Sequence, residues 1–162
     1  MERFCKNICE LYQKECLRTS SEADIVRIQN MSAKRGFSGC TSSLDCMHWE
    51  WKNCPTAYHG QYKGKEKRPT IILEGVADDE LWIWHAFFGM PGACNDINVV
   101  DNSPLFDEIM AGLFPPSTQY VINGVSRSRG YYLADGIYNR WAVLVQDYKK
   151  PINEKEPLFS RL

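Results

Sequence analysis

Apolar positions at the start of the chain recur with the period of an α-helix. Between residues 2 and 17, one helical face carries Phe4, Ile8, Leu11, Tyr12 and Cys16. This i, i+4, i+7, i+8 spacing is typical of an amphipathic helix. The pattern therefore predicts an opening helix with one apolar side.

A second helix is predicted after the polar segment that follows. Either Ser20 or Ser21 can cap its first turn, and Asp24 stands three residues beyond Ser21, as a capping box requires. The helix would bury its two isoleucines and end before the glycine-containing segment 36–39, which favours a break in the chain. We therefore expect a helical preface over residues 1–35.

The pattern then changes from helical to strand-like. Strands are predicted, in chain order, at 42–47, 71–77, 81–88, 120–122 and 131–134. The polar turn 78–80 makes the second and third of these an antiparallel hairpin. The polar segment 52–70 predicts a loop or hairpin, and 123–130 predicts a loop. A helix is expected from Asn95 to Met110, with Pro104 opening its second half. Residues 140–145 fit a helix and a strand equally.

This order of elements predicts the fold class. Three consecutive strands, a helix and further strands favour an α/β fold, with helices packed against a mixed sheet. The chain has 162 residues, enough for one domain with a real core. We expect that domain over residues 36–162, after the helical preface.

Composition argues against several classes of protein. The net charge is −1, which argues against strong non-specific binding to nucleic acid. No apolar run reaches the roughly 18–20 residues of a membrane helix, and the charged N-terminus shows no secretory signal. Seven cysteines without a CxxC pair favour reduced, inert thiols over structural zinc.

Two aspartates occupy places that suit metal chemistry. Asp45 lies within the first predicted strand, and Asp135 directly follows the strand 131–134. If these strands lie side by side, both carboxylates come within reach of one ion such as Mg²⁺, which prefers oxygen ligands. Taken singly, each aspartate is more often a turn or strand-end residue. Asp96 is a third candidate, although Asn95 or Asp96 as a helix N-cap would explain that segment alone.

Basic residues supply candidate contacts to phosphate. They are Lys63, Lys65, Lys67 and Arg68 in the first polar segment, and Arg127 and Arg129 in the second. A solvated charged loop is the other interpretation of both runs. The aromatic segment 47–51 fits base stacking and core packing equally, and Glu74 and Glu50 are weaker acidic candidates.

Long strings in this chain resemble a known family. LDCMHWEWKNCPTAYHGQYKGK, KRPTIILEGVADDELWIWHAFFGMPGACNDINVVDNSPLF and GYYLADGIYNRWAVLV are similar to the plant-transposon branch of the PIF/Harbinger transposases, which are DDE superfamily endonucleases. The resemblance covers residues 36–162 closely and residues 2–35 more loosely.

The resemblance implies a ribonuclease H-like fold and two-metal phosphodiester chemistry on DNA, with Mg²⁺ or Mn²⁺ as cofactor. By this resemblance, Asp45 and Asp135 are the first two catalytic carboxylates, and Asp96 is a further metal ligand. Transposon ends and target DNA are the implied partners, and the nucleus, or else the cytoplasm, is the implied location.

The family's third catalytic residue is a glutamate on a later helix, and no match to its motif precedes Leu162. Glu154 and Glu156 stand in a different, proline-flanked context. We therefore expect a fold that is incomplete at its C-terminus and an inactive copy of the nuclease. The alternative is a domesticated, non-catalytic module that binds DNA or protein. A sheet face left uncovered would favour a protein partner or self-association.

Overall fold

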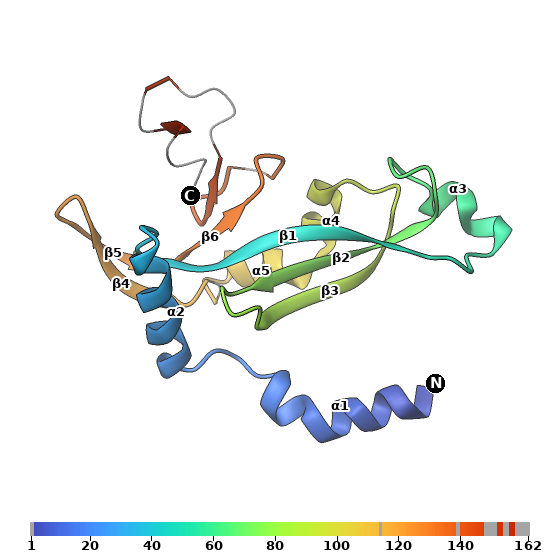
Figure 1. Cartoon of the computed structure of the whole chain (residues 1–162), viewed down its shortest axis with the longest axis horizontal. Coiled ribbons are helices and arrows are strands. Elements are labelled where there is room, and N and C mark those ends of the chain that lie inside the picture. Colours follow the sequence, from blue (N-terminus) through green and yellow to red (C-terminus); the bar gives the residue numbers. More distant parts are fainter. Residues whose placement is uncertain (1, 114, 139, 148–151, 154–155, 158–162) are drawn as a thin grey trace.

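The computed structural model describes residues 2–113, 115–138, 140–147, 152–153 and 156–157. In this part of the chain, a five-stranded sheet with the strand order β3-β2-β1-β6-β7 forms the centre, and β4 and β5 form a separate two-stranded sheet (Figure 1). No helix in the described ranges is long and apolar enough to cross a membrane.

The central sheet is mixed. Its strands are β1 (Cys40–Glu50), β2 (Thr70–Ala77), β3 (Ile83–Pro91), β6 (Tyr131–Ala134) and β7 (Leu144–Gln146). β1, β2 and β3 pair antiparallel in sequence, whereas β6 runs parallel to β1 and β7 runs parallel to β6. The predicted α/β class, with a mixed sheet and flanking helices, is confirmed. Residues 140–145, which fitted a helix and a strand equally in the sequence, lead into the strand β7.

The helices are α1 (Glu2–Cys16), α2 (Glu22–Lys34), the 3₁₀ turn η1 (Thr56–Tyr58), α3 (His59–Tyr62), α4 (Asp96–Asn102) and α5 (Pro104–Met110). The single helix predicted over 95–110 is wrong, because Ser103 divides it. Ser103 has extended dihedral angles (φ −82°, ψ 142°), as a residue before proline favours. The short helices η1 and α3 lie where the sequence predicted only a loop or hairpin.

A second correction concerns the loop predicted over 123–130. There, β4 (Ser117–Ile122) and β5 (Val125–Arg129) form a hairpin around Asn123 and Gly124, both at positive φ. Every residue of β5 is exposed, so the strand shows no apolar alternation that could reveal it. The Asn-Gly pair, a frequent two-residue hairpin turn, was the available signal.

One face of the central sheet holds the core. α4 and α5 cover this face, and the buried cluster comprises Leu44, Val76, Val100, Leu105, Ile109, Tyr132, Tyr138, Val143 and Leu144. The opposite face exposes Met47 and Trp49 of β1 and Ile83 and Phe88 of β3, each by more than half of its surface. These four residues, defined here as the open sheet face, share one side because of the strand register.

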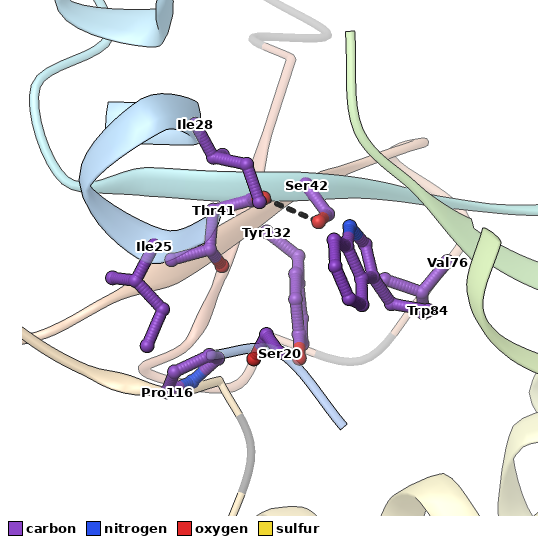
Figure 2. Close-up of a pocket in the computed structure, with 9 residues that line it drawn as sticks. All are labelled: Ser20, Ile25, Ile28, Thr41, Ser42, Val76, Trp84, Pro116 and Tyr132. Carbon is purple, nitrogen blue, oxygen red and sulfur yellow. Dashed lines mark hydrogen bonds between the residues drawn. The ribbon is translucent and has the colours of Figure 1, made fainter. Parts of the chain in front are cut away.

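The two N-terminal helices differ in how they pack. α1 has no buried residue, so its predicted apolar side stays exposed. α2 instead packs against one end of the sheet, where Ile25 and Ile28 face Trp84 and Tyr132 across a small apolar pocket (Figure 2). Burial raises the pKa of Tyr132 well above its ordinary value. α2 is therefore part of the packing around the sheet.

Ion pairs also connect α2 to the β2–β3 turn. Arg27 of α2 contacts the carboxylate of Asp78 at 3.0 Å and also pairs with Glu80. Asp78 is buried and accepts hydrogen bonds from the backbone N–H groups of Glu80 and Trp82. The antiparallel hairpin predicted from the turn at 78–80 is confirmed, and the structure shows in addition that α2 is held at this turn.

The capping box of α2 gives a first testable expectation. The Ser21 hydroxyl accepts from the N–H of Asp24 at 3.3 Å, and the N–H of Ser21 donates back to the Asp24 carboxylate at 2.8 Å. We expect Ser21→Ala to lower the free energy of unfolding by about 1 kcal/mol, because an N–H at the helix start loses its partner. Urea unfolding measures this. Ser20→Ala is the matched control, and an equal loss in both variants would contradict the expectation.

Candidate carboxylate site

Asp45 and Asp135 lie next to each other on two neighbouring parallel strands. The last paired residues of β1 and β6 are Leu44 and Ala134, so the next residue on each strand is one of the two aspartates. Neighbouring strands lie about 5 Å apart. β6 ends at this point while β1 continues, so both aspartates lie where β1 loses its parallel neighbour. The condition that the sequence left open, that these two strands lie side by side, is met.

The side chain of Asp45 points away from the core. Leu44 is buried and Cys46 half-buried on the face covered by α4 and α5, whereas Asp45 is exposed on the other side of the strand. This is the alternation expected of successive residues in a β-strand. One carboxylate oxygen of Asp45 accepts the backbone N–H of Cys46 at 2.8 Å.

Asp96 begins α4, and the structure separates it from the capping role. Asn95 is the N-cap: its side-chain oxygen accepts the N–H of Asn98 at 2.8 Å, and Asn98 returns a hydrogen bond to the Asn95 backbone. Asp96 occupies the first helical position instead and is half-buried. The N-cap interpretation therefore accounts for Asn95 and leaves the Asp96 carboxylate without that explanation.

Electrostatics join the three aspartates. Burial raises the pKa of Asp96 above its ordinary value, and the negative charges of Asp45 and Asp135 raise it further. His48 and Lys65 act in the opposite direction. The charges of Asp45 and Asp135 therefore reach Asp96, which makes the three carboxylates candidates for one site. We call it the aspartate site.

The donor chemistry of the aspartate site fits Mg²⁺ or Mn²⁺, since both prefer carboxylate oxygens. A cation would also relieve the repulsion that raises the pKa of Asp96. Within the described ranges, no group of three or more His, Cys, Asp or Glu side chains is already close enough to hold a metal ion. The aspartate site thus has suitable ligands, but they are not drawn together around a cation.

The cysteines do not suit zinc. All seven are free. Burial raises the pKa of Cys40 to about 11 and that of Cys46 to about 12, so both stay protonated at neutral pH. Zinc binds the thiolate form. On the opposite side of β1 from the Asp45 side chain, Cys46 packs against the core cluster that includes the buried Tyr138.

The predicted phosphate contacts separate into two groups at opposite ends of the molecule (Figure 1). The group formed by Lys63, Lys65, Lys67 and Arg68 lies between α3 and β2, and the charge of Lys65 reaches Asp96. Arg127 and Arg129 lie on β5 instead. The first group is therefore the one beside the aspartate site.

Two of the six basic residues already have protein partners. Arg68 pairs with Glu50 at 3.4 Å, and Arg129 donates to the backbone oxygen of Ile109 at 3.1 Å. Ile109 lies in the last turn of α5, where a cation is favourable. Glu156 accepts from Asn153 and lies beside the β4–β5 hairpin, and Glu154 falls outside the described residues.

Sequence reasoning missed a buried polar cluster beneath the sheet. Glu74 is fully buried, and one of its oxygens accepts from the Ser103 hydroxyl at 2.8 Å and lies 3.3 Å from the His85 ring nitrogen. The other oxygen has no hydrogen-bond partner among the described residues. A glutamate at an inward position of the apolar strand β2 was the available signal.

Comparison with known proteins decides the family. The family model described as plant transposon protein matches residues 14–162. The chain belongs to the plant transposon protein family. No curated protein matches it, and neither does any solved structure. The match includes all three members of the aspartate site, and it confirms the transposon relationship that the sequence strings indicated.

In this plant transposon protein, the pKa of Asp96 should respond to its neighbours. We expect Asp45→Asn to lower the pKa of Asp96, because one of the two negative charges that raise it is removed. An NMR titration of the Asp96 carboxyl measures the change. Asp101→Asn, an exposed position on the same helix, is the control.

The same shift has a consequence for stability. A carboxyl whose pKa is higher in the folded than in the unfolded protein favours folding while it is protonated, and that contribution is lost as pH rises through the folded value. We therefore expect Asp96→Asn to remove part of the loss of stability above about pH 4. An unchanged pH profile of urea unfolding would contradict this.

Proposed function

We propose that this chain is a transposase-derived DDE endonuclease of the PIF/Harbinger type, with a ribonuclease H-like fold, from the class of proteins that cleave and transfer phosphodiester bonds in DNA. The observation that carries the proposal is the placement of Asp45 and Asp135 side by side at the end of β6, with Asp96 coupled to both. Membership of the plant transposon protein family supports a transposase-related role.

The chemistry assigned to the aspartate site is metal-dependent. Asp45, Asp135 and Asp96 would hold Mg²⁺ or Mn²⁺, and a bound cation supplies Lewis acidity and an activated water or 3′-hydroxyl. Asp45 and Asp135 would bind the cation from adjacent strands, and the pairing of those strands fixes their spacing. A cation in the site would lower the raised pKa of Asp96 and so favour its carboxylate form.

The basic segment beside the site suits a DNA partner. Lys63, Lys65 and Lys67 are exposed, and no salt bridge to another described residue occupies them. They are placed to contact phosphates of a strand that enters the aspartate site. On this proposal the protein works on transposon ends and target DNA, and therefore in the nucleus.

A nicking assay tests the proposal. The purified chain is incubated with supercoiled DNA and Mg²⁺ or Mn²⁺, and conversion to open circles is followed. The inactive copy expected from the sequence would give no nicking. Nicking that stops with a chelator and is lost in Asp45→Ala and in Asp135→Ala would contradict that expectation and support the aspartate site. Nicking that persists in both variants would place the chemistry elsewhere and overturn the proposed site.

A non-catalytic role is the second candidate, and one observation favours it: the aspartate site lacks a formed group of metal ligands among the described residues. A module that only binds DNA would show strongly salt-dependent affinity that survives Asp45→Ala and Asp135→Ala, without nicking. A module that binds protein, or a second copy, would use the open sheet face and would associate without DNA.

A further inference from the structure

Three aromatic rings gather beyond the end of β1. Trp51 stacks on Tyr58 with ring centroids 6.4 Å apart and planes 19° apart. Tyr62 meets Trp51 edge-on at 4.9 Å and Tyr58 at 6.3 Å. Tyr58 keeps half of its surface exposed, whereas Trp51 and Tyr62 are half-buried. This trio lies outside the main core cluster, and Tyr58 offers an accessible aromatic surface.

The segment that carries the rings is also the most basic of the chain. Residues 51–68 contain five lysine or arginine side chains and one acidic residue, Glu66, in a protein with a net charge of −1. Its Lys63, Lys65 and Lys67 are exposed and follow directly after Tyr62. An aromatic surface bordered by cations is the arrangement that binds unpaired nucleotides, since bases stack on rings while phosphates meet lysines.

Close backbone contact holds this segment to the loop that leads to Asp96. A Cβ atom at Gly64 would lie 1.9 Å from the carbonyl oxygen of Gly92, so the two backbones touch. The backbone N–H of Trp51 also donates to the backbone oxygen of Pro69 at 2.9 Å. The basic segment is therefore fixed relative to the aspartate site, and Lys65 contributes to the electrostatic field at Asp96.

The geometry points to a single-stranded DNA site: we propose that Trp51, Tyr58 and Tyr62, with Lys63, Lys65 and Lys67, bind an unpaired strand that flanks the cleavage point. This proposal rests on the proposed endonuclease function. Trp51 follows Asp45 by six residues, which corresponds to about 20 Å of extended strand. The stacked base would therefore lie several nucleotides from the bond at the aspartate site.

An unpaired strand fits better than duplex DNA or a peptide. In a duplex, the faces of the bases are covered by their neighbours, so Tyr58 could stack on none of them. Aromatic clusters also bind proline-rich peptides, but the excess of lysine in 51–68 selects for a polyanion. A peptide at this site is accordingly an outcome of the test below.

The test measures binding of a fluorescent thymidine oligonucleotide to the full chain, by anisotropy, in a chelator and at low salt. We expect Tyr58→Ala to weaken binding by about tenfold or more, and Tyr58→Phe to bind within about twofold of wild type, because the ring is kept. Tyr12→Ala is the matched control, since Tyr12 is an equally exposed tyrosine on α1. The same sequence as a duplex should bind more weakly and be insensitive to Tyr58→Ala.

A second variant covers the case in which Tyr58→Ala does not fold. Lys65→Gln combined with Lys67→Gln should lower the slope of log affinity against log salt by about 1.4, because two phosphate contacts are lost. Equal affinity of Tyr58→Ala and Tyr58→Phe, or an unchanged salt slope in the lysine variant, would overturn the proposal. So would an oligonucleotide that does not bind while a proline-rich peptide does.

The chelator separates this proposal from the function on which it rests. Oligonucleotide binding is measured without metal, so a failed nicking assay leaves its result unaffected. Conversely, wild-type nicking with no effect of Tyr58→Ala on either assay would reject the single-strand site and leave the aspartate site standing.

Discussion

Asp45→Asn is expected to weaken Mn²⁺ binding by about tenfold or more, and Asp135→Asn should do the same. Substitution of groups that merely orient metal ligands costs about 10- to 100-fold in affinity, so loss of a direct carboxylate ligand should cost at least as much. Asparagine keeps the size of aspartate and removes only the charge. Isothermal titration calorimetry or the electron paramagnetic resonance signal of free Mn²⁺ measures the affinity.

A double variant makes this test specific for one shared site. If Asp45 and Asp135 bind the same ion, the second substitution should cost less than the first, because the shared interaction is already lost. Asp101→Asn, which lies on α4 outside the aspartate site, should leave the affinity unchanged. Equal affinities for wild type, Asp45→Asn and Asp135→Asn would exclude the aspartate site as a metal site.

Local pattern predicted the positions of Asp45 and Asp135 on their strands, because those positions depend on strand alternation and strand ends. Leu44 and Cys46 are apolar and Asp45 is not, so a strand through them turns the carboxylate outward. The Asp135 position followed from the end of an apolar run. What pattern alone did not supply was the parallel pairing of β1 with β6, which brings together residues 90 positions apart. The family resemblance supplied that expectation.

The sequence was less informative where tertiary contacts decide the structure. α1 has a well-formed apolar side, yet none of its residues is buried, because periodicity reports a helix and not its partner. The exposed strand β5 has no apolar alternation. The break between α4 and α5 depends on the buried contacts of Ser103 as well as on Pro104.

Glu74→Ala is the substitution we expect to destabilise the fold most, by about 2–4 kcal/mol. Glu74 is fully buried between the sheet and the helices, so truncation leaves a cavity. It also removes the acceptor for the Ser103 hydroxyl and the neighbour of His85. Ser103 itself accepts the N–H of Leu105 at the start of α5.

The control for this substitution is Glu50→Ala. Glu50 is an exposed glutamate of the neighbouring strand, paired at the surface with Arg68. A surface ion pair contributes about 0–1 kcal/mol, so this variant should unfold close to the wild-type midpoint in urea. If Glu74→Ala and Glu50→Ala unfold at the same urea concentration, the hydrogen bonds of the buried cluster around Glu74 contribute little to stability.

The buried cluster around Glu74 is incompletely hydrogen-bonded. One oxygen of Glu74 has no hydrogen-bond partner in the described part of the chain, and an unpaired buried oxygen offsets part of what the other oxygen contributes. Ser103 ends α4, the helix that begins with Asp96. If the cluster serves to hold α4, then Glu74→Ala should also weaken Mn²⁺ binding at temperatures where the protein remains folded. Glu50→Ala should not, although Glu50 lies nearer in sequence to Asp45.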